Sequence, residues 1–537
     1  FNTNKVTNMS YLFQGCESLK ELNLSNFNTS KVTNMSFMFQ GCSSLKSLNL
    51  SNFDTTRVNN MSKMFKGCSS LTELNLLKFN TGNVTNMDFM FKLCNSLSSL
   101  NLDDFKPSQC LSMAQMFYSC RSLTELSLTT FNTELVTNMF GMFDDCFSLT
   151  SLNLSSFNTS LVTNFGKMFR NCYSLESIYF SDKFDTQKGN NMSNMFFNCS
   201  SLTSLNLIYF KTPKVITMIY MFYHCSNLTY LKLNSNRFKT SRVTNMTFMF
   251  FDCNKLDNLD ISFFDTSNVM DMKYMFGQCE SLSELNISNF NTSLVENMEY
   301  MFYKCKNMEK LEISSNFDTS KVTNMRYMFT QCNKLKELNI SHFETSLVED
   351  MRNMFYNCSL LEKLDVSNFD TTNVQDMKFM FFSCSNLIEL DASNFVTNKV
   401  TDMKYMFCGC SNIANLTLSK FVTSNVVDMQ YMFANCHSLN ELIFDFDTSQ
   451  TTNMSYMFSN CENLISIPIT NTFITSQVKN MEFMFYNCKS LISLSLESFN
   501  TELVENMEKM FKNCRSLLSL DLSTFKTYKV NNTIGMF

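Results

Sequence analysis

Residues 27–52 read FNTSKVTNMSFMFQGCSSLKSLNLSN, and the rest of the 537-residue chain repeats this pattern. The repeats begin at Phe1, Phe27, Phe53, Phe79, Phe105, Phe131, Phe157, Phe184, Phe210, Phe238, Phe264, Phe290, Phe317, Phe343, Phe369, Phe395, Phe421, Phe446, Phe473, Phe499 and Phe525. This gives twenty whole repeats and half of another, with positions counted here from the first Phe of each. A fixed period of about 20 to 50 residues indicates a solenoid or a propeller array.

Phe and Met are concentrated at fixed positions of the repeat. Phe occupies positions 1 and 13 of all 21 repeat starts, and Met occupies position 9 in 19 of them and position 12 in 20. A Met-rich surface can form an adaptable binding groove. Residues at fixed positions of a stacked repeat are more typical of a core, so we predict that these side chains fill the interior.

The first half of the repeat predicts a short helix. The apolar residues at positions 9, 12, 13 and 16 follow the spacing of one helical face. Position 8 is Asn or Asp in 19 of 21 repeat starts, as at Asn34, and such residues cap helix N-termini. Position 15 is often Gly or Asn, as at Gly41, and these residues tolerate the left-handed conformation that ends a helix. Only about six residues lie between the caps, so the helix depends on packing.

The second half predicts a strand. Leu48 and Leu50 alternate with Ser47 and Asn49, which is the pattern of a strand with one buried face. One strand per repeat, always in the same direction, stacks as a parallel sheet, with the rest of the repeat as the crossover. Val at position 6, as at Val32, is expected to point into the core and to add a short second bridge.

A family resemblance rests on these leucines. The segment Leu19-x-x-Leu22-x-Leu24-x-x-Phe27 matches the first half of the leucine-rich repeat, except that Phe27 stands where that repeat has Asn or Cys. The whole repeat resembles the BspA-like leucine-rich-repeat family, also described as mycoplasma lipoprotein-associated repeats, over the full chain. The resemblance implies a surface-exposed or secreted protein used in adhesion or binding, with no catalytic motif.

We therefore predict an α/β solenoid, a curved leucine-rich-repeat-like rod with one parallel strand and one short helix per 26-residue repeat. Residues 1–537 are expected to form a single continuous domain, about 95 Å long at the usual strand spacing, and to be a segment of a longer chain. The net charge of −5 is spread evenly, which argues against a nucleic-acid partner. No apolar run is long enough for a membrane span, and no signal peptide is visible.

Twenty of the 22 cysteines stand at position 16, from Cys16 to Cys514, and the two others are Cys110 and Cys408. Stacked neighbours would lie close enough for disulfides, but their Cβ vectors would run parallel where a bridge needs them to converge. We favour free buried thiols over a disulfide ladder. The C-x-C pair of Cys408 and Cys410 stays open as a separate case.

No catalytic, cofactor or metal site is expected. The three histidines, His224, His342 and His437, lie in different repeats, and none is joined by enough ligands for a metal. Nucleophilic catalysis lacks a base for the same reason. The irregular repeat at Phe105, with Pro107 and Cys110, could hold a local ligand, but we favour sequence drift.

The surface carries the remaining candidates for function. Outward strand positions hold small polar groups, which predict a possible binding face without exposed aromatics at Asn49, Asn75, Asn101 and Asn153. One hypothesis is a non-enzymatic extracellular or cell-surface scaffold that assembles with itself, end to end or laterally, including into fibres. The other is an adhesin that binds a glycan or a host surface protein on this face.

Glycosylation acceptors of the type N-x-S/T are frequent, although each alone is weak evidence in a chain rich in Asn, Ser and Thr. Those at position 8, expected to face outward as helix caps, and at position 2, in a turn, are predicted to be accessible. The possible N-glycosylation sites are Asn8, Asn28, Asn34, Asn60, Asn158, Asn245, Asn291, Asn357 and Asn453.

Overall fold

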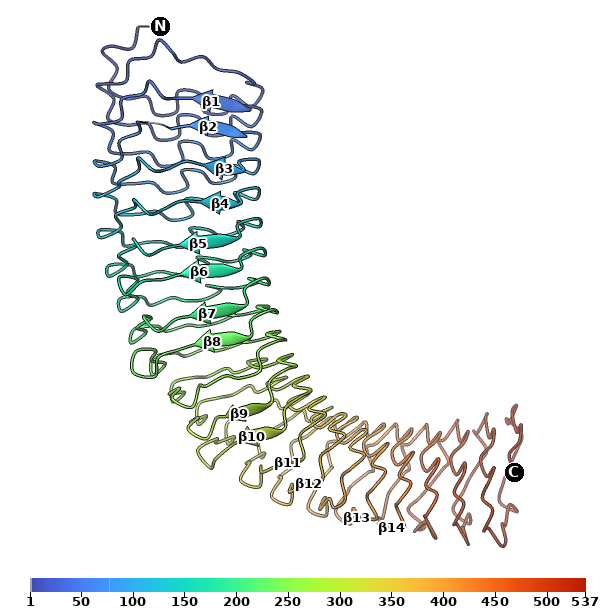
Figure 1. Cartoon of the computed structure of the whole chain (residues 1–537). Coiled ribbons are helices and arrows are strands. Elements are labelled where there is room, and N and C mark those ends of the chain that lie inside the picture. Colours follow the sequence, from blue (N-terminus) through green and yellow to red (C-terminus); the bar gives the residue numbers. More distant parts are fainter. Residues whose placement is uncertain (1, 77) are drawn as a thin grey trace. The chain divides into compact units, whose positions relative to one another are not determined.

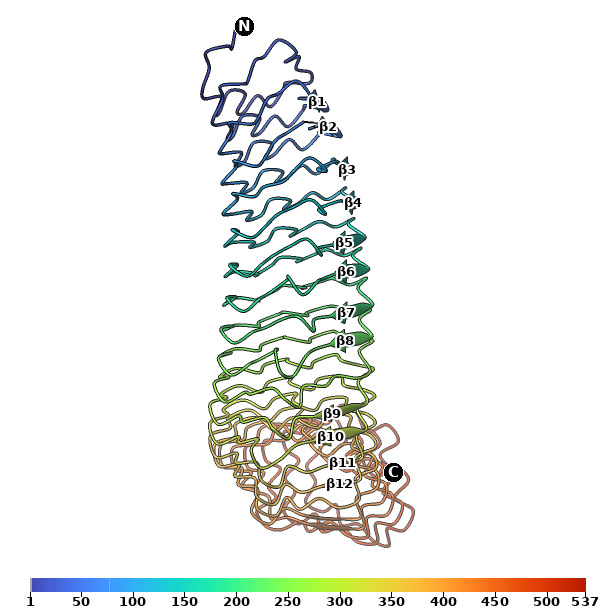
Figure 2. The same ribbon diagram turned by 60° about the vertical axis from the view of Figure 1, so that its left-hand side comes forward.

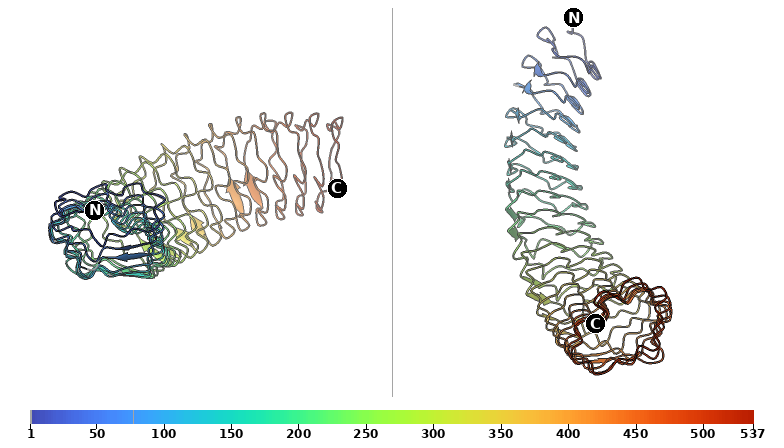
Figure 3. Two further views of the ribbon diagram at one scale, coloured as in Figure 1. Left: turned by 90° about the horizontal axis from the view of Figure 1, so that it is seen from above. Right: turned by 90° about the vertical axis from the view of Figure 1, so that its right-hand side faces the viewer.

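The computed structural model describes residues 2–76 and 78–537. The chain forms two compact units, Phe1–Asn268 and Val269–Phe537, and each is a stack of coils with one repeat per coil (Figure 1). Seen end-on, the coils of each unit superpose as a ring around a filled interior (Figure 3). The predicted solenoid of stacked repeats is confirmed within each unit.

Short parallel strands lie at the Leu-x-Leu segment of the repeats. Figure 2 shows β1 to β8 following one another along one side of the first unit. The strands are β1 Ser47–Asn49, β2 Glu73–Asn75, β3 Ser99–Leu100, β4 Glu125–Leu126, β5 Ser151–Asn153, β6 Ser177–Tyr179, β7 Ser204–Asn206 and β8 Tyr230–Lys232 in the first unit, and β9 Glu284–Asn286, β10 Lys310–Glu312, β11 Glu337–Leu338, β12 Lys363–Leu364, β13 Asn415–Thr417 and β14 Glu441–Ile443 in the second. They pair in parallel as β1–β2, β3–β4, β5–β6, β7–β8, β9–β10, β11–β12 and β13–β14. Equivalent leucines face each other, as Leu48 does Leu74.

A second parallel ladder runs through another part of each coil. It joins position 8 of successive repeats, from Asn8 through Asn34 and Asn60 to Asn245 in the first unit. In the second unit it runs from Asp271 to Asn532. The second bridge predicted at Val32 therefore forms two residues later, at Asn34, while Val32 itself is fully buried.

The predicted short helix is wrong, because no helix occurs in residues 2–76 and 78–537. Alternate N–H groups of positions 9 to 15 donate along the stack to the next repeat, as Phe37 N does to Ser62 O (3.0 Å) and Phe39 N to Met64 O (2.9 Å). The N–H groups between them donate within the repeat and close tight turns, as Gln40 N does to Phe37 O (3.1 Å). These N–H groups would donate within the segment if it were a helix, and here the turns and the next repeat supply their acceptors instead. None of the described residues forms a helix able to cross a membrane.

Two left-handed residues in each repeat make these turns. Position 15 has positive φ, as at Gly41 (77°), Asn171 (58°) and Asn357 (55°), which agrees with the predicted preference for Gly or Asn. Position 11 is also left-handed and includes bulky residues such as Phe37 (61°) and Tyr300 (57°). A left-handed residue interrupts a right-handed helix, so two of them four positions apart leave no room for one.

The predicted core is confirmed at the repeat positions of Val32, Met35, Met38, Phe39, Cys42, Leu45, Leu48 and Leu50, all buried. Position 13 forms a phenylalanine ladder: the rings of Phe39 and Phe65 stack with centroids 5.6 Å apart and planes 5° apart. In the first repeat Leu12 is 47% exposed and Cys16 is exposed, so the expectation of a buried thiol is wrong at Cys16.

A threonine ladder at position 3 was not predicted. Thr55, which is 1% exposed, donates its hydroxyl to Asn80 O (2.9 Å) and accepts a hydrogen bond from Asn80 N (2.7 Å). Thr29 does the same with the backbone of Asp54 in the next repeat. One buried hydroxyl therefore satisfies both backbone groups of a residue in the neighbouring coil.

Candidate binding face

The outward side chains of the strands form one face of each unit, which we call the strand face. In β1, Ser47 and Asn49 are exposed on either side of buried Leu48. Asn49 lies opposite Asn75 in the pairing of β1 with β2. Three of the four residues predicted for the binding face, Asn49, Asn75 and Asn101, thus occupy successive coils, whereas Asn153 lies two coils further on, in β5.

The asparagines at the end of the strands also have a structural task. The side-chain oxygen of Asn49 accepts a hydrogen bond from Ser51 N (3.0 Å), and that of Asn153 accepts one from Ser155 N (3.0 Å). Asn101 forms the same turn with Asp103 N (2.9 Å). The turn fixes the orientation of each amide and leaves its NH2 group as the part that could meet a ligand.

Two cavities open on the strand face. The first, of about 350 Å³, brings Asn75 and Asn101 together with Thr72, Glu73, Leu74, Leu76 and Ser99. The second, of about 330 Å³, lies in the second unit and is lined by Ser493, Leu494, Ser495, Leu496, Glu497, Ser519, Asp521 and Thr524. Both are shallow hollows lined by hydroxyl, amide and carboxylate groups.

The charge of the strand face differs between the two units. In the first unit the strand residues that face outward are mostly Ser and Asn. In the second unit they include charged pairs such as Lys310 and Glu312, whose Nζ and Oε1 atoms lie 2.5 Å apart. Hydrogen bonds from Ser393 to Asp391 lower the pKa of that carboxyl, so Asp391 is ionised at neutral pH.

The expectation of a face without exposed aromatics is wrong. Tyr179 in β6 and Tyr230 in β8 are 62% and 55% exposed. Both follow from the alternation of their strands, because each stands next to a residue that faces the core, Ile178 or Leu231. That alternation could have identified them from the sequence.

A second aromatic series was also missed, at the left-handed position 11. In the second unit Tyr300 stacks between Tyr274 and Tyr327, with centroids 4.3 and 4.4 Å away. Burial beside these rings raises the pKa of Tyr300. Because the ring faces cover one another, this series stabilises the stack of coils and offers only ring edges to solvent.

The thiols are free, as predicted: Cys16 is exposed, Cys514 is half-buried and the other twenty are buried. The S–H group of Cys68 donates to Phe39 O (3.1 Å), and the same contact recurs along the ladder. Burial raises the pKa of Cys225 to about 12. Cys408 and Cys410 are both buried and free, so these two residues form no disulfide.

Several of the remaining titratable groups form ion pairs between coils. Asp144 is 1% exposed, and its Oδ1 atom accepts from Arg170 Nε (2.7 Å). His224 pairs with Asp252, and His437 Nδ1 lies 3.8 Å from Glu462 Oε1. Within residues 2–76 and 78–537, no three His, Cys, Asp or Glu side chains are arranged to hold a metal ion. The chemistry of these groups is therefore that of cross-links between repeats.

The possible glycosylation sites divide by exposure. Asn8, Asn28 and Asn291 are exposed, whereas Asn34, Asn60, Asn158, Asn245, Asn357 and Asn453 are half-buried. The expectation that position 8 faces outward as a helix cap is wrong, because the oxygen of Asn34 instead accepts from Ser36 N (2.9 Å) in a turn. Which sites carry sugar stays a prediction.

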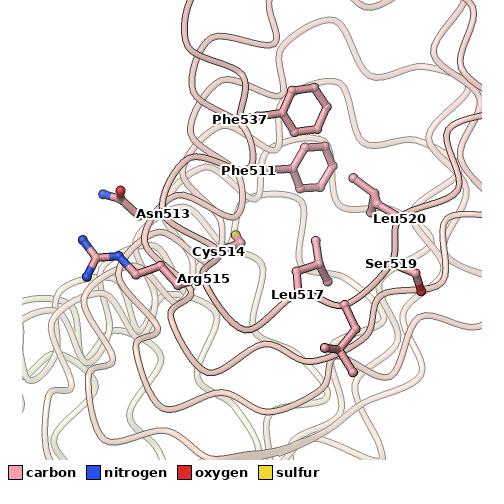
Figure 4. Close-up of a pocket in the computed structure, with 9 residues that line it drawn as sticks. Phe511, Asn513, Cys514, Arg515, Leu517, Ser519, Leu520 and Phe537 are labelled. Atoms are coloured by element: carbon pink, nitrogen blue, oxygen red, sulfur yellow. The ribbon is translucent and has the colours of Figure 1, made fainter.

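An apolar cavity of about 420 Å³ lies at the last whole repeat (Figure 4). Phe511 and Phe537 stack above it with centroids 5.8 Å apart, and Leu517 and Leu520 point toward it. These are core positions of the repeat. Asn513, Arg515 and Ser519 also line the cavity, so it joins apolar core positions to polar residues of the surface.

Solved structures of bacterial leucine-rich-repeat proteins are similar to this chain. One from Bacteroides ovatus shares 17% identity over 66% of this chain and 82% of its own, with a TM-score of 0.31. One from Eubacterium ventriosum shares 15% identity over 68% and 84%, with a TM-score of 0.28. A leucine-rich cell surface protein from Faecalibacterium prausnitzii shares 16% over 76% and 84%, with a TM-score of 0.26. No curated protein matches the chain.

One protein-family model matches repeatedly along the sequence. Its matches cover residues 1–100, 42–151, 90–205, 150–235, 226–314, 307–415, 382–470, 402–518 and 465–537. The stacked coils and the Leu-x-Leu strands described above are thus the structure of its repeat. The protein belongs to the family described as "Mycoplasma protein of unknown function, DUF285".

Proposed function

We propose that the protein is a non-enzymatic repeat scaffold that acts outside the cell or on its surface. The observation that carries this proposal is that thiols and buried acids, the side chains that could do chemistry, instead hold successive coils together. Thiols donate to backbone carbonyls, as Cys68 does to Phe39 O (3.1 Å), and buried acids pair with bases of the next coil. What is left to vary is the outer surface, which is typical of repeat proteins with a structural or protein-interaction role.

The extracellular location is supported by the resemblance to the BspA-like family and by exposed acceptor sites such as Asn28 and Asn291. Protease treatment of intact cells tests it. A surface protein loses its full-length band while a cytoplasmic marker protein stays intact. Protection of the protein until the cells are lysed would contradict the extracellular location.

Assembly into fibres is the second part of this proposal. Each repeat presents one side to the repeat before it and a matching side to the repeat after it, as in the stack of Phe39 on Phe65 (5.6 Å). A head-to-tail contact of this kind extends without closing. Electron microscopy of native material tests it: long filaments support fibre formation, and discrete short particles contradict it.

A second candidate function is a binding module, an adhesin whose strand face holds a host protein or a glycan. It is favoured by the cavity of about 350 Å³ that Asn75 and Asn101 share. Replacing Asn49, Asn75 and Asn101 with Ala should abolish binding to host-cell surfaces and preserve the fold. Asn59→Ala is a matched control, since Asn59 is exposed in the same coil as Asn75 but outside the strand face. Unchanged binding by the triple variant would contradict this function.

A further inference from the structure

Four successive strands of the first unit carry a surface that differs from the rest of its strand face. The strands β5 to β8 follow one another along one side of the unit (Figures 1 and 2). Asn153 lies opposite Tyr179 in the β5–β6 pair, and Ser204 lies opposite Tyr230 in the β7–β8 pair. The eight outward residues, all exposed, are Ser151, Asn153, Ser177, Tyr179, Ser204, Asn206, Tyr230 and Lys232.

The two tyrosine side chains on this surface are largely exposed. Tyr179 is 62% exposed and Tyr230 is 55% exposed. In the position-11 series, by contrast, each ring lies between its neighbours, as Tyr300 does at 4.3 and 4.4 Å. Exposed tyrosine rings combine a flat apolar face with a polar rim, and they are enriched where proteins bind partners.

Hydrogen-bonding groups lie beside the two rings: Asn153 is in β5, next to the strand of Tyr179, and Asn206 is in β7, between the strands of the two tyrosines. The side-chain oxygens of Asn153 and Asn206 accept from Ser155 N (3.0 Å) and Ile208 N (3.3 Å). Each amide is thereby oriented, and its NH2 group is left to donate outward. Among the eight residues only Lys232 is charged, so the surface is suited to a neutral partner.

We propose that this surface binds a neutral oligosaccharide, with Tyr179 and Tyr230 as stacking platforms and the amides of Asn153 and Asn206 as donors to sugar hydroxyls. The proposal rests on the binding-module function of the strand face and names its ligand class. A pyranose ring has an apolar C–H face and a rim of hydroxyls, which matches an exposed ring beside amide and hydroxyl groups.

A peptide partner fits this surface less well. Protein hot spots insert side chains into well-packed pockets that exclude water. The two cavities of the strand face described above lie elsewhere, at Thr72–Asn101 and at Ser493–Thr524. Flat rings between small polar groups favour a flat, hydroxylated ligand.

The experiment applies the labelled whole chain to a printed array of neutral and acidic glycans, followed by calorimetric titration of the best neutral glycan. Tyr179→Ala and Tyr230→Ala should each weaken that binding about tenfold, because each removes one stacking surface. Tyr179→Phe and Tyr230→Phe keep the ring and should bind within about threefold of the wild type. Tyr173→Ala is the matched control: Tyr173 is 36% exposed in the same coil as Tyr179 but outside the strand face, and it should bind as the wild type does.

Several results would overturn the proposal: binding to acidic glycans alone, no binding to any glycan, or neutral-glycan binding that survives both Ala substitutions. A protein partner lost with the same substitutions would also overturn it. These outcomes are separable from failure of the binding-module function. That function is tested by host-cell binding of the variant with Ala at Asn49, Asn75 and Asn101. A protein that binds cells through the strand face but binds no glycan would therefore contradict only the glycan proposal.

Discussion

Phe37 and Gly41 both have left-handed backbone, with φ of 61° and 77°, four residues apart in the segment that carries the apolar spacing of a helix. The N–H groups of both residues donate to the next repeat, to Ser62 O (3.0 Å) and Lys66 O (2.8 Å). The left-handed turns therefore serve the stack: they rotate alternate donors out of the coil and toward the neighbouring one. Every whole repeat has this pair of turns.

A substitution at Gly41 tests the left-handed turn. A Cβ atom added there would meet its nearest neighbours, Gly15 Cα and N, at 3.6 Å, which is ordinary contact, so the expected cost comes from the backbone alone. Gly41→Ala should lower the free energy of unfolding by about 1 to 2 kcal/mol. Gly41→Asn should cost less, because Asn tolerates this conformation. Urea unfolding followed by circular dichroism measures both; an equal cost for Ala and Asn would contradict the assignment.

Removal of one ring from the phenylalanine ladder should have a large but local effect. Phe65 is fully buried and stacks on Phe39 and Phe91 at 5.6 Å each. Phe65→Ala should cost about 3 to 5 kcal/mol, and in a stack of repeats the loss should fall on the adjoining coils. Hydrogen exchange should quicken in residues 39–91 and stay unchanged in residues 375–430. Uniform loss of protection along the chain would contradict local coupling.

The threonine ladder makes a sharper test, because Val has nearly the shape of Thr. Thr55→Val removes the hydroxyl that bonds both backbone groups of Asn80 and leaves them unsatisfied beside a buried methyl. The expected loss of stability is about 1 to 3 kcal/mol. Thr56→Val is the control: Thr56 is exposed and its hydroxyl donates to the exposed carboxylate of Asp54, so its replacement should cost less than about 0.5 kcal/mol. Equal costs would show that the buried hydroxyl is dispensable.

Asp144 should make the first unit less stable as pH rises. Burial raises the pKa of its carboxyl from 3.8 to about 6, despite the hydrogen bond and charge of Arg170, and its Oδ2 atom is buried without a partner. The folded state therefore holds this proton more tightly than the unfolded state does. The contribution of Asp144 to the free energy of unfolding is greatest below pH 4 and falls by roughly 3 kcal/mol as pH rises through 6.

Asp144→Asn removes this titration. The stability of the variant relative to the wild type should increase between about pH 4 and pH 7. Asp103→Asn, at an exposed carboxyl, provides the comparison and should show little change. Thermal unfolding of all three proteins across this range measures the difference. A relative stability of Asp144→Asn that decreases with pH would contradict the raised pKa.

The buried thiols should resist modification. Burial raises the pKa of Cys120 and Cys225 to about 12, and thiol reagents attack the thiolate. At pH 8 a disulfide reagent should label Cys16 quickly and Cys514 more slowly, and it should reach the other cysteines only after urea is added. Peptide mass spectrometry locates the label. Rapid labelling of Cys225 in the native protein would contradict its burial.

The sequence was sufficient for the features that depend on side-chain pattern. The alternation around Leu48 predicted the parallel strands, and the fixed positions of Phe39 and Cys42 predicted a core of rings and free thiols. The strands and the core could both be predicted because they depend only on which positions of the repeat are apolar. Gly and Asn at position 15 correctly indicated left-handed backbone.

The helix was mispredicted because the same apolar spacing also fits a chain that turns twice and bonds to its neighbour. Local pattern does not show where an N–H group donates, and here Phe37 N donates 25 residues away in sequence, to Ser62 O. Phe and Tyr at position 11 did not indicate the left-handed turn there, since bulky residues seldom adopt positive φ. Tyr179 and Tyr230 were missed for another reason: they are departures from the repeat, and the consensus conceals them.

Stacking contacts recur from junction to junction within the first unit: Thr29 bonds to the backbone of Asp54 as Thr55 bonds to that of Asn80. Duplication or loss of one whole 26-residue segment in the gene therefore joins two surfaces that already fit each other. Recombination between repeats can lengthen or shorten such a protein in steps of one coil without a new contact having to evolve. The number of repeats is thus free to differ among descendants of this gene, while the geometry of each coil is not.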